Sequence, residues 1–131
     1  MTQMRISDAA ELLGVSDDTV RRMVDADRLP ATRDDAGRLV VEGAALAALA
    51  QEIARPAAVG TVADESARNR MRGVVTRVVT DTVMAQVEMQ CGPFRIVSLL
   101  SREAVESLGL EVGSVAVASI KSTNVVVGVP Q

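Results

Sequence analysis

Hydroxyl and cationic side chains at two places in the sequence have the chemistry needed to bind an anion. Ser66 and Arg68 lie close together. Lys121 and Ser122 are adjacent, much further along the chain. An anion with several acceptor oxygens needs hydrogen-bond donors from several directions and positive charge without a nearby carboxylate. These four residues supply both, and unpaired backbone N–H groups around Ala67 and Ser122 can add further donors.

Catalysis and metal binding through histidine or cysteine are disfavoured by the residue types present. The sequence has no histidine, and Cys91 is its one cysteine, so an internal disulfide and a Cys/His metal site are both excluded. Cys91 also lacks a base, and no carboxylate pair or phosphate-binding loop is placed for catalysis. We therefore expect no enzyme activity. Cys91 is interpreted as a packing residue at a strand end, with a reactive thiol as the less favoured alternative.

Length and composition predict a globular, cytoplasmic protein that associates with copies of itself. The 131 residues fit one ordinary domain or two small ones, and 48% are hydrophobic while 24% are charged. Phe94 is the one aromatic residue, so the core must be built from aliphatic side chains that each bury little area. Domains this small are marginal alone, and association would bury more surface. No 18-residue apolar run and no signal-peptide pattern is present, so we expect no membrane contact.

The first part of the sequence predicts two helices separated by a tight turn. Ser7 is expected to cap the first helix, and Gly14 to end it in a left-handed turn. Ser16 is expected to cap the second helix, and Pro30 to stop it. The predicted inward-facing positions are Ala9, Ala10, Leu12 and Leu13 of the first helix and Val20, Met23 and Val24 of the second.

A hairpin and a third helix are expected to follow. Short strands around Thr32 and at 39–41 are joined through Asp34-Asp35-Ala36-Gly37, and residues 44–52 have helical spacing. The segment from Ile6 to Ser16, with Thr19-Val20-Arg21-Arg22 and Leu29-Pro30, resembles the helix-turn-helix DNA-binding domain of the MerR and excisionase families. That resemblance implies that the second helix enters the major groove of double-stranded DNA and that the hairpin acts as a wing. The residues expected to face DNA are Ser16, Thr19, Arg21 and Arg22, with Arg33 and Arg38 of the wing.

The acidic net charge of residues 1–55 leaves a second interpretation of the predicted helix-turn-helix domain open. Residues 1–55 hold seven arginines and ten acidic residues, whereas DNA-binding domains are usually basic. The alternative is a helical module that docks another protein.

The remainder of the sequence predicts a small β-barrel after a linker. Val83, Ala85, Val87 and Met89 alternate with polar residues, as in a strand with one solvated face. Further strands are predicted at 72–79, 94–100, 115–120 and 125–129, with a helix that Ser101 caps and Gly109 ends. Five strands and one helix fit a closed barrel of the OB type. The predicted fold is α+β, with a winged helix-turn-helix domain at 1–54, a linker at 55–65 and an OB-type barrel at 66–131.

The barrel region resembles the molbindin (Mop, TOBE) family. The residues that carry the resemblance are Ser66-Ala67-Arg68-Asn69, Gly73-Val74-Val75, Ser101 with Leu108-Gly109-Leu110 and Gly113, and Ile120-Lys121-Ser122-Thr123-Asn124-Val125. The resemblance implies a barrel that binds molybdate or tungstate between subunits of a homo-oligomer. It also implies which residues contact the oxyanion: Ser66, Ala67, Arg68, Asn69, Lys121 and Ser122, with Ser101 contributed by a partner subunit. The family has a second serine where this chain has Ala104.

Two classes of function remain in competition. A barrel that binds single-stranded nucleic acid is disfavoured, because Phe94 is the one base-stacking residue and residues 56–131 carry seven basic and seven acidic groups. The favoured function is a molybdate- or tungstate-responsive transcriptional regulator that assembles as a hexamer or, alternatively, as a dimer. The other is a store or buffer of these oxyanions whose N-terminal domain contacts protein. Binding of a defined operator by residues 1–54 distinguishes the two.

Overall fold

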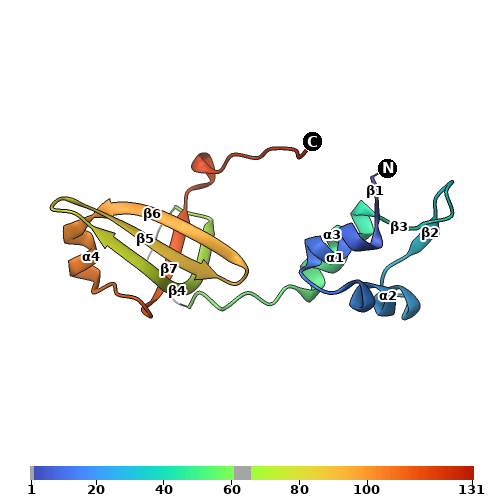
Figure 1. The fold of residues 1–131 in the computed structure, drawn as a ribbon, viewed down its shortest axis with the longest axis horizontal. Helices are drawn as coiled ribbons and strands as arrows, with labels where there is room; N and C mark the ends of the chain where they lie inside the picture. Colours follow the sequence, from blue (N-terminus) through green and yellow to red (C-terminus); the bar gives the residue numbers. More distant parts are fainter. Residues whose placement is uncertain (1, 61–65) are drawn as a thin grey trace. The chain divides into compact units, whose positions relative to one another are not determined.

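The structure is a computed structural model that describes residues 2–60 and 66–131 of the chain. It divides into an N-terminal unit, Met1–Arg55, and a C-terminal unit, Pro56–Gln131 (Figure 1). Part of the predicted 55–65 linker lies outside the described residues. The helices within the described ranges are all too short or too polar to cross a bilayer.

The N-terminal unit is a helix-turn-helix with a small sheet, as predicted. Its elements are β1 (Gln3–Arg5), α1 (Ile6–Leu13), α2 (Asp17–Asp25), β2 (Ala31–Arg33), β3 (Leu39–Glu42) and α3 (Gly43–Ile53). The antiparallel sheet has the order β1-β3-β2, so β2 and β3 form the expected hairpin. β1 was not predicted from the sequence, because three residues are too few to show an alternating pattern.

Local side-chain chemistry accounts for the turn between α1 and α2. Gly14 ends α1 in the left-handed conformation at φ 71°, which a glycine adopts without steric cost. The hydroxyl of Ser16 accepts a hydrogen bond of 3.2 Å from the backbone N–H of Thr19 and so caps α2. Both interactions confirm the sequence interpretation.

Three details of the predicted helices were wrong. Ser7 does not cap α1, since the helix begins one residue earlier at Ile6, where β1 runs directly into it without a side-chain cap. Pro30 does not stop α2 either. The helix ends at Asp25, and Asp27 turns the chain at φ 58°. Leu12 was expected to face inward, but it is 69% exposed.

A single apolar cluster holds the N-terminal unit together. Its buried members are Ile6, Ala9, Ala10, Val20, Leu29, Val41, Leu46 and Leu49. These residues come from all three helices, from β3 and from the segment before β2. The orientation of α2 against α1 and the hairpin is therefore fixed by buried side chains.

The C-terminal unit is a four-stranded antiparallel sheet with one helix. Its elements are β4 (Asn69–Thr80), β5 (Met84–Cys91), β6 (Phe94–Ser101), α4 (Arg102–Leu108), β7 (Val115–Ile120) and a 3-10 turn, η1 (Ser122–Asn124). The order β6-β5-β4-β7 arises because the long strand β4 pairs with β7 through its first half and with β5 through its second. The predicted helix cap is present: the hydroxyl of Ser101 accepts a hydrogen bond of 3.0 Å from the N–H of Ala104.

The predicted fifth strand was wrong. Residues 125–131 form no strand, and Val126, Val127 and Val129 are 86–93% exposed. In the described part of the chain β6 and β7 are therefore the edge strands of a four-stranded antiparallel sheet, so the predicted α+β fold class is confirmed although the strand at 125–129 is absent. The segment is rich in valine, but none of the strands among residues 2–60 and 66–131 pairs with it.

The face of β5 that was expected to be solvated is partly covered. Ala85, Val87 and Met89 are buried as predicted, but Glu88 on the opposite face is also only 9% exposed. Arg95 forms an ion pair with its carboxylate, and Gln86 donates a hydrogen bond to it. The Arg95 hydrogen bond holds the pKa of Glu88 below its usual value, against the opposing effect of burial.

Candidate functional site

The pairing of β4 with β7 brings the two anion-binding segments of the sequence together. Asn69 is the first residue of β4 and lies opposite Ile120, the last residue of β7. The side-chain amide of Asn69 also donates a hydrogen bond of 3.2 Å to the carbonyl oxygen of Ile120. Because Arg68 directly precedes this pair and Lys121 directly follows it, both cations lie at the same end of the sheet.

The side chains at this end of the sheet are available to a ligand. Arg68, Lys121 and the hydroxyls of Ser66 and Ser122 are exposed, whereas Ala67 and Asn69 are half-buried. Among residues 2–60 and 66–131, the side chains of Arg68 and Lys121 have no hydrogen bond or ion pair. Two exposed cations flanked by hydroxyls have the positive charge and the hydrogen-bond donors that an anion requires.

Ser101 does not join this group within one chain. It lies opposite Met84, and Ala85 lies opposite Thr80, so Ser101 is level with the far end of β4 from Asn69. At about 3.3 Å per residue, the length of β4 separates the two ends by roughly 35 Å along the strand. The structure therefore brings together six of the seven residues predicted for the oxyanion and leaves out Ser101.

Ser101 lies instead in a hollow of about 410 Å³ at the start of α4. Its oxygen caps the helix, and a hydroxyl that accepts one hydrogen bond keeps its own O–H to donate. Arg102 beside it forms an ion pair of 3.0 Å with Glu106 and donates to the carbonyl oxygen of Asp81 at 3.3 Å. Hydrogen bonds from the N–H groups of Met84 and Val83 lower the pKa of the Asp81 carboxyl.

In the N-terminal unit, the residues predicted to face DNA fall into two groups. Ser16 and Thr19 are engaged with each other, because their hydroxyls lie 2.9 Å apart at the start of α2. Arg21, Arg33 and Arg38 line a pocket of about 320 Å³. Arg22 is exposed on α2 but is not part of the lining of this pocket.

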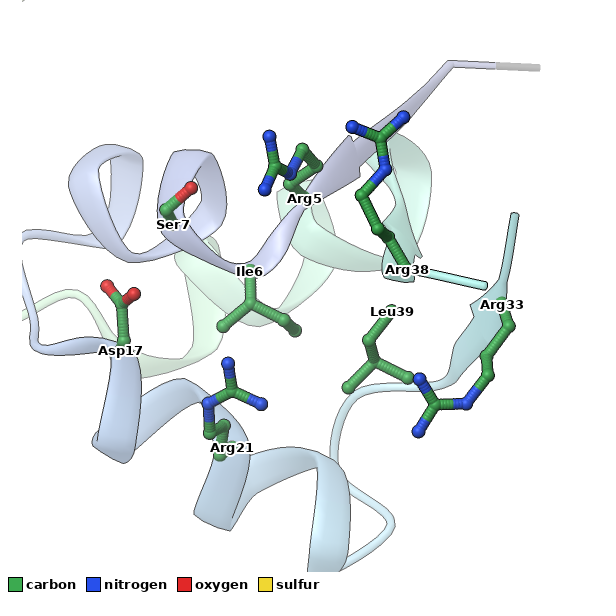
Figure 2. Close-up of a pocket in the computed structure, with 8 residues that line it drawn as sticks. All are labelled: Arg5, Ile6, Ser7, Asp17, Arg21, Arg33, Arg38 and Leu39. Carbon is green, nitrogen blue, oxygen red and sulfur yellow. The ribbon is translucent and has the colours of Figure 1, made fainter. Parts of the chain in front are cut away.

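Sequence reasoning missed one cation of this pocket. Figure 2 shows Arg5 beside Ser7 at the start of α1, with Arg38 on the same side of the pocket in that view and Arg21 and Arg33 on the other. Asp17 completes the charged lining. Nothing in the pattern around Arg5 indicated its role, because only the pairing of β1 with β3 places it next to the wing.

The wing is held in shape by its own side chains. The carboxylate of Asp34 accepts hydrogen bonds from the N–H groups of Arg38 and Ala36, at 2.9 and 3.0 Å, and these lower the pKa of its carboxyl. Arg33 donates to the carbonyl oxygen of Gly37 at 2.9 Å. These bonds fix the loop that presents Arg33 and Arg38.

Among the described residues, no three His, Cys, Asp or Glu side chains gather in a way that could hold a metal ion.

The arrangement is that of a two-unit binding protein, with a helix-turn-helix unit and an antiparallel-sheet unit that carries a cationic end. Comparison with known families agrees with this class: the helix-turn-helix domain family matches residues 4–53, and the TOBE domain family matches residues 65–127.

Curated relatives identify the family. The chain is 43% identical over 65 residues to the probable molybdenum-pterin-binding protein of Haemophilus influenzae, a match that covers 49% of this chain and 94% of that protein. It is 36% identical over 63 residues to molybdenum-pterin-binding protein 3 of Clostridium pasteurianum, covering 47% of this chain and 93% of that one. The chain belongs to the family of these molybdenum-pterin-binding proteins, to which about half of its length is similar.

Two solved structures are also similar to part of the chain. A molybdate-binding protein from Sporomusa ovata is 30% identical, with a TM-score of 0.48 and coverage of 49% of this chain and 96% of that one. The cytoplasmic molybdate-binding protein ModG, solved with molybdate bound, is 41% identical, with a TM-score of 0.49. The match to ModG covers 51% of this chain and 48% of that chain.

Proposed function

We propose that the chain is a molybdate- or tungstate-responsive regulator that binds DNA through its N-terminal unit. The observation that carries the proposal is the pairing of Asn69 with Ile120, which places Arg68 and Lys121 at one end of the sheet. The relatives support a molybdenum-containing ligand, since they are named for binding molybdenum-pterin. The helix-turn-helix family match supports the DNA partner.

In this proposal the oxyanion contacts Ser66, Ala67, Arg68, Asn69, Lys121 and Ser122 of one chain and Ser101 of a second chain. The distance along β4 requires the second chain, because Ser101 is at the opposite end of its own sheet. Ala104 offers no hydroxyl, so one donor is absent from the second chain's contribution. Binding is selective by size: donors held at fixed spacing close on molybdate or tungstate and not on the smaller sulfate.

The exposed apolar surface of the C-terminal unit supports the proposal that these units associate. Leu99, Val115 and Val126 are 71%, 62% and 93% exposed, although an isolated soluble domain usually covers such side chains. The resemblance to the Mop family, with a single Mop unit in each chain, favours six copies arranged as three dimers. A dimer is the alternative, because one two-fold axis is enough for a palindromic operator.

For the DNA-binding role, α2 is the helix that enters the major groove. Its exposed face carries Arg21 and Arg22, and the wing adds Arg33 and Arg38. Ser16 and Thr19 complete the proposed DNA contacts from the start of α2. Anion binding alters the spacing of N-terminal units in the oligomer and thereby the DNA affinity, with a coupling of about 1 to 3 kcal/mol that must act equally in both directions.

A store or buffer of the same oxyanion is the second candidate, favoured by the acidic balance of residues 1–55. The named relatives are binding proteins, which supports a binding function in either case. Both candidates share the oxyanion site, so DNA binding is the property that separates them.

The test uses the full chain in two measurements. Calorimetric titration should show saturable binding of molybdate and tungstate and much weaker binding of sulfate; equal sulfate affinity contradicts the proposed site. Fluorescence anisotropy with DNA from upstream of the chain's own gene, at one fixed salt concentration, should give different affinities with and without molybdate. Oxyanion binding without any DNA binding supports the store. DNA binding that molybdate leaves unchanged shows two independent units on one chain.

A further inference from the structure

The pocket between α1, α2 and the wing concentrates positive charge in a unit that is acidic as a whole. Its lining holds four arginines and one aspartate. The arginines come from separate segments: Arg5 from β1, Arg21 from α2, Arg33 from β2 and Arg38 from the loop before β3. Because folding brings these four segments together, the positive pocket is a property of the fold and not of the local sequence.

The arginines of this pocket retain donors for a ligand. The side chains of Arg5 and Arg21 have no hydrogen bond or ion pair with any of the residues that the structure describes. Arg33 uses one N–H on the carbonyl oxygen of Gly37, and Arg38 uses its Nε on Asp34 at 3.3 Å, which leaves most of their five N–H groups. Gathered guanidinium groups repel one another unless an anion lies between them.

The rest of the lining fits a small anion. Ile6 and Leu39 provide an apolar surface between the guanidinium groups in the view of Figure 2. Ser7 adds a hydroxyl at the start of α1, a helix whose first N–H groups have no side-chain cap. The Asp17 carboxylate repels an anion, but the four arginines leave the pocket with a net positive charge. The volume of about 320 Å³ is at the lower end of the range of about 300–1,000 Å³ for ligand pockets.

We propose that this pocket binds a tetrahedral phosphate-type oxyanion, with Arg5 and Arg21 as its main contacts. The planar fork of a guanidinium matches two oxygens of such a group. The anion is a phosphodiester of a DNA backbone or a free phosphate ion. The first source rests on the proposed DNA-binding function, whereas the second is independent of it.

The test compares the full chain with two variants, Arg5→Gln and Arg28→Gln. Arg28 is the matched control, since it is an exposed arginine of the same unit that forms an ion pair of 3.2 Å with Glu52 and does not line the pocket. One arm follows the backbone N–H signals of Ile6 and Ser7 by NMR during titration with inorganic phosphate. The other measures affinity for random-sequence duplex DNA at several salt concentrations.

If the occupant is DNA, Arg5→Gln weakens binding to every sequence about equally and reduces the slope of log affinity against log salt by about 1, while Arg28→Gln changes neither. If it is a free ion, DNA binding is unaffected, but phosphate shifts the Ile6 and Ser7 signals in a saturable way that Arg5→Gln abolishes. Phosphate binding here in a chain that binds no DNA supports the pocket and refutes only the DNA-binding function. Equal effects of both variants, or none in either arm, overturn the proposal.

Discussion

The side-chain amide of Asn69 donates a hydrogen bond to the carbonyl oxygen of Ile120, 51 positions further along the chain. This bond adds to the backbone pairing of the same two residues and ties the start of β4 to the end of β7. Replacing Asn69 by Ala should therefore lower molybdate affinity without unfolding the sheet, since the neighbouring backbone pairs remain. Calorimetry for affinity, with circular dichroism for fold content, measures the two effects separately. Loss of the fold would show that Asn69 is structural and not a positioning residue.

Lys121→Ala should reduce molybdate affinity most among single changes at this end of the sheet. Hydrogen bonds to charged groups contribute about 1.5–3 kcal/mol, so the expected loss is about 10- to 150-fold. Calorimetric titration measures it, with Arg28→Ala in the N-terminal unit as a control for the loss of one positive charge. An unchanged affinity would exclude Lys121 from the oxyanion contacts.

Gly73→Ala should destabilise the C-terminal unit. A Cβ at this position would lie 2.4 Å from the carbonyl oxygen of Gln90 and 2.6 Å from Sγ of Cys91, so β4 and β5 must move apart. Overpacking of this kind costs about 1–3 kcal/mol. Urea unfolding measures the loss, and Gly128→Ala is the control because a Cβ there meets no atom within 4 Å. Equal stability of the two variants would show that the close packing around Gly73 is not rigid.

Glu88 should make the stability of the C-terminal unit depend on pH in the acid range. Its pKa is below the usual value of 4.5 in the folded chain, chiefly through the hydrogen bond from Arg95. The folded state therefore binds this proton less readily than the unfolded state, so the stabilisation is present above pH 4.5 and is lost as pH falls through the folded pKa. Urea unfolding at a series of pH values should show a shallower acid-side loss for Glu88→Gln than for the native chain. Glu111→Gln, at an exposed carboxylate of the same unit, is the control for the removal of one carboxylate.

Val127→Asp should prevent assembly without affecting the fold of a single chain. The Val127 side chain is 86% exposed, so the change costs little in the isolated unit. In an oligomer that covers this segment, the same carboxylate would be buried without a partner. Light scattering should give a smaller particle for Val127→Asp than for the native chain and for Gln131→Asp. A native chain that is already monomeric with molybdate present would refute the shared oxyanion site.

The elements that were predictable are those whose signals are local. Gly14, Ser16, Ser101 and Gly109 mark helix ends through their own backbone conformation or hydroxyl, and each does so in the structure. The predictions that were wrong concern features that depend on contacts with distant parts of the chain. Ser7 was displaced as a cap because β1 pairs with β3 and sets the start of α1. That pairing cannot be read from three residues.

The candidate site was predictable only in part for the same reason. The residue types at 66–69 and 121–122 indicate anion chemistry, but the register of β4 against β7 is what places them together. The burial of Glu88 and the position of Arg5 depend on partners from other strands, Arg95 on β6 and the wing beside β3. Side chains that meet across strands leave no fixed spacing in the sequence.

The exposed valines at the end of the chain also bear on how this protein behaves at low concentration. An apolar segment with free backbone donors can nucleate cross-β aggregates when its normal covering is absent. Gly128 and Pro130 interrupt the run, and proline has no N–H for a continuing ladder. In the proposed oligomer, dilution that separates the subunits would thus expose an aggregation-prone segment limited to Val125, Val126 and Val127. Subunit assembly would then serve as protection from misfolding, whether or not an oxyanion is bound.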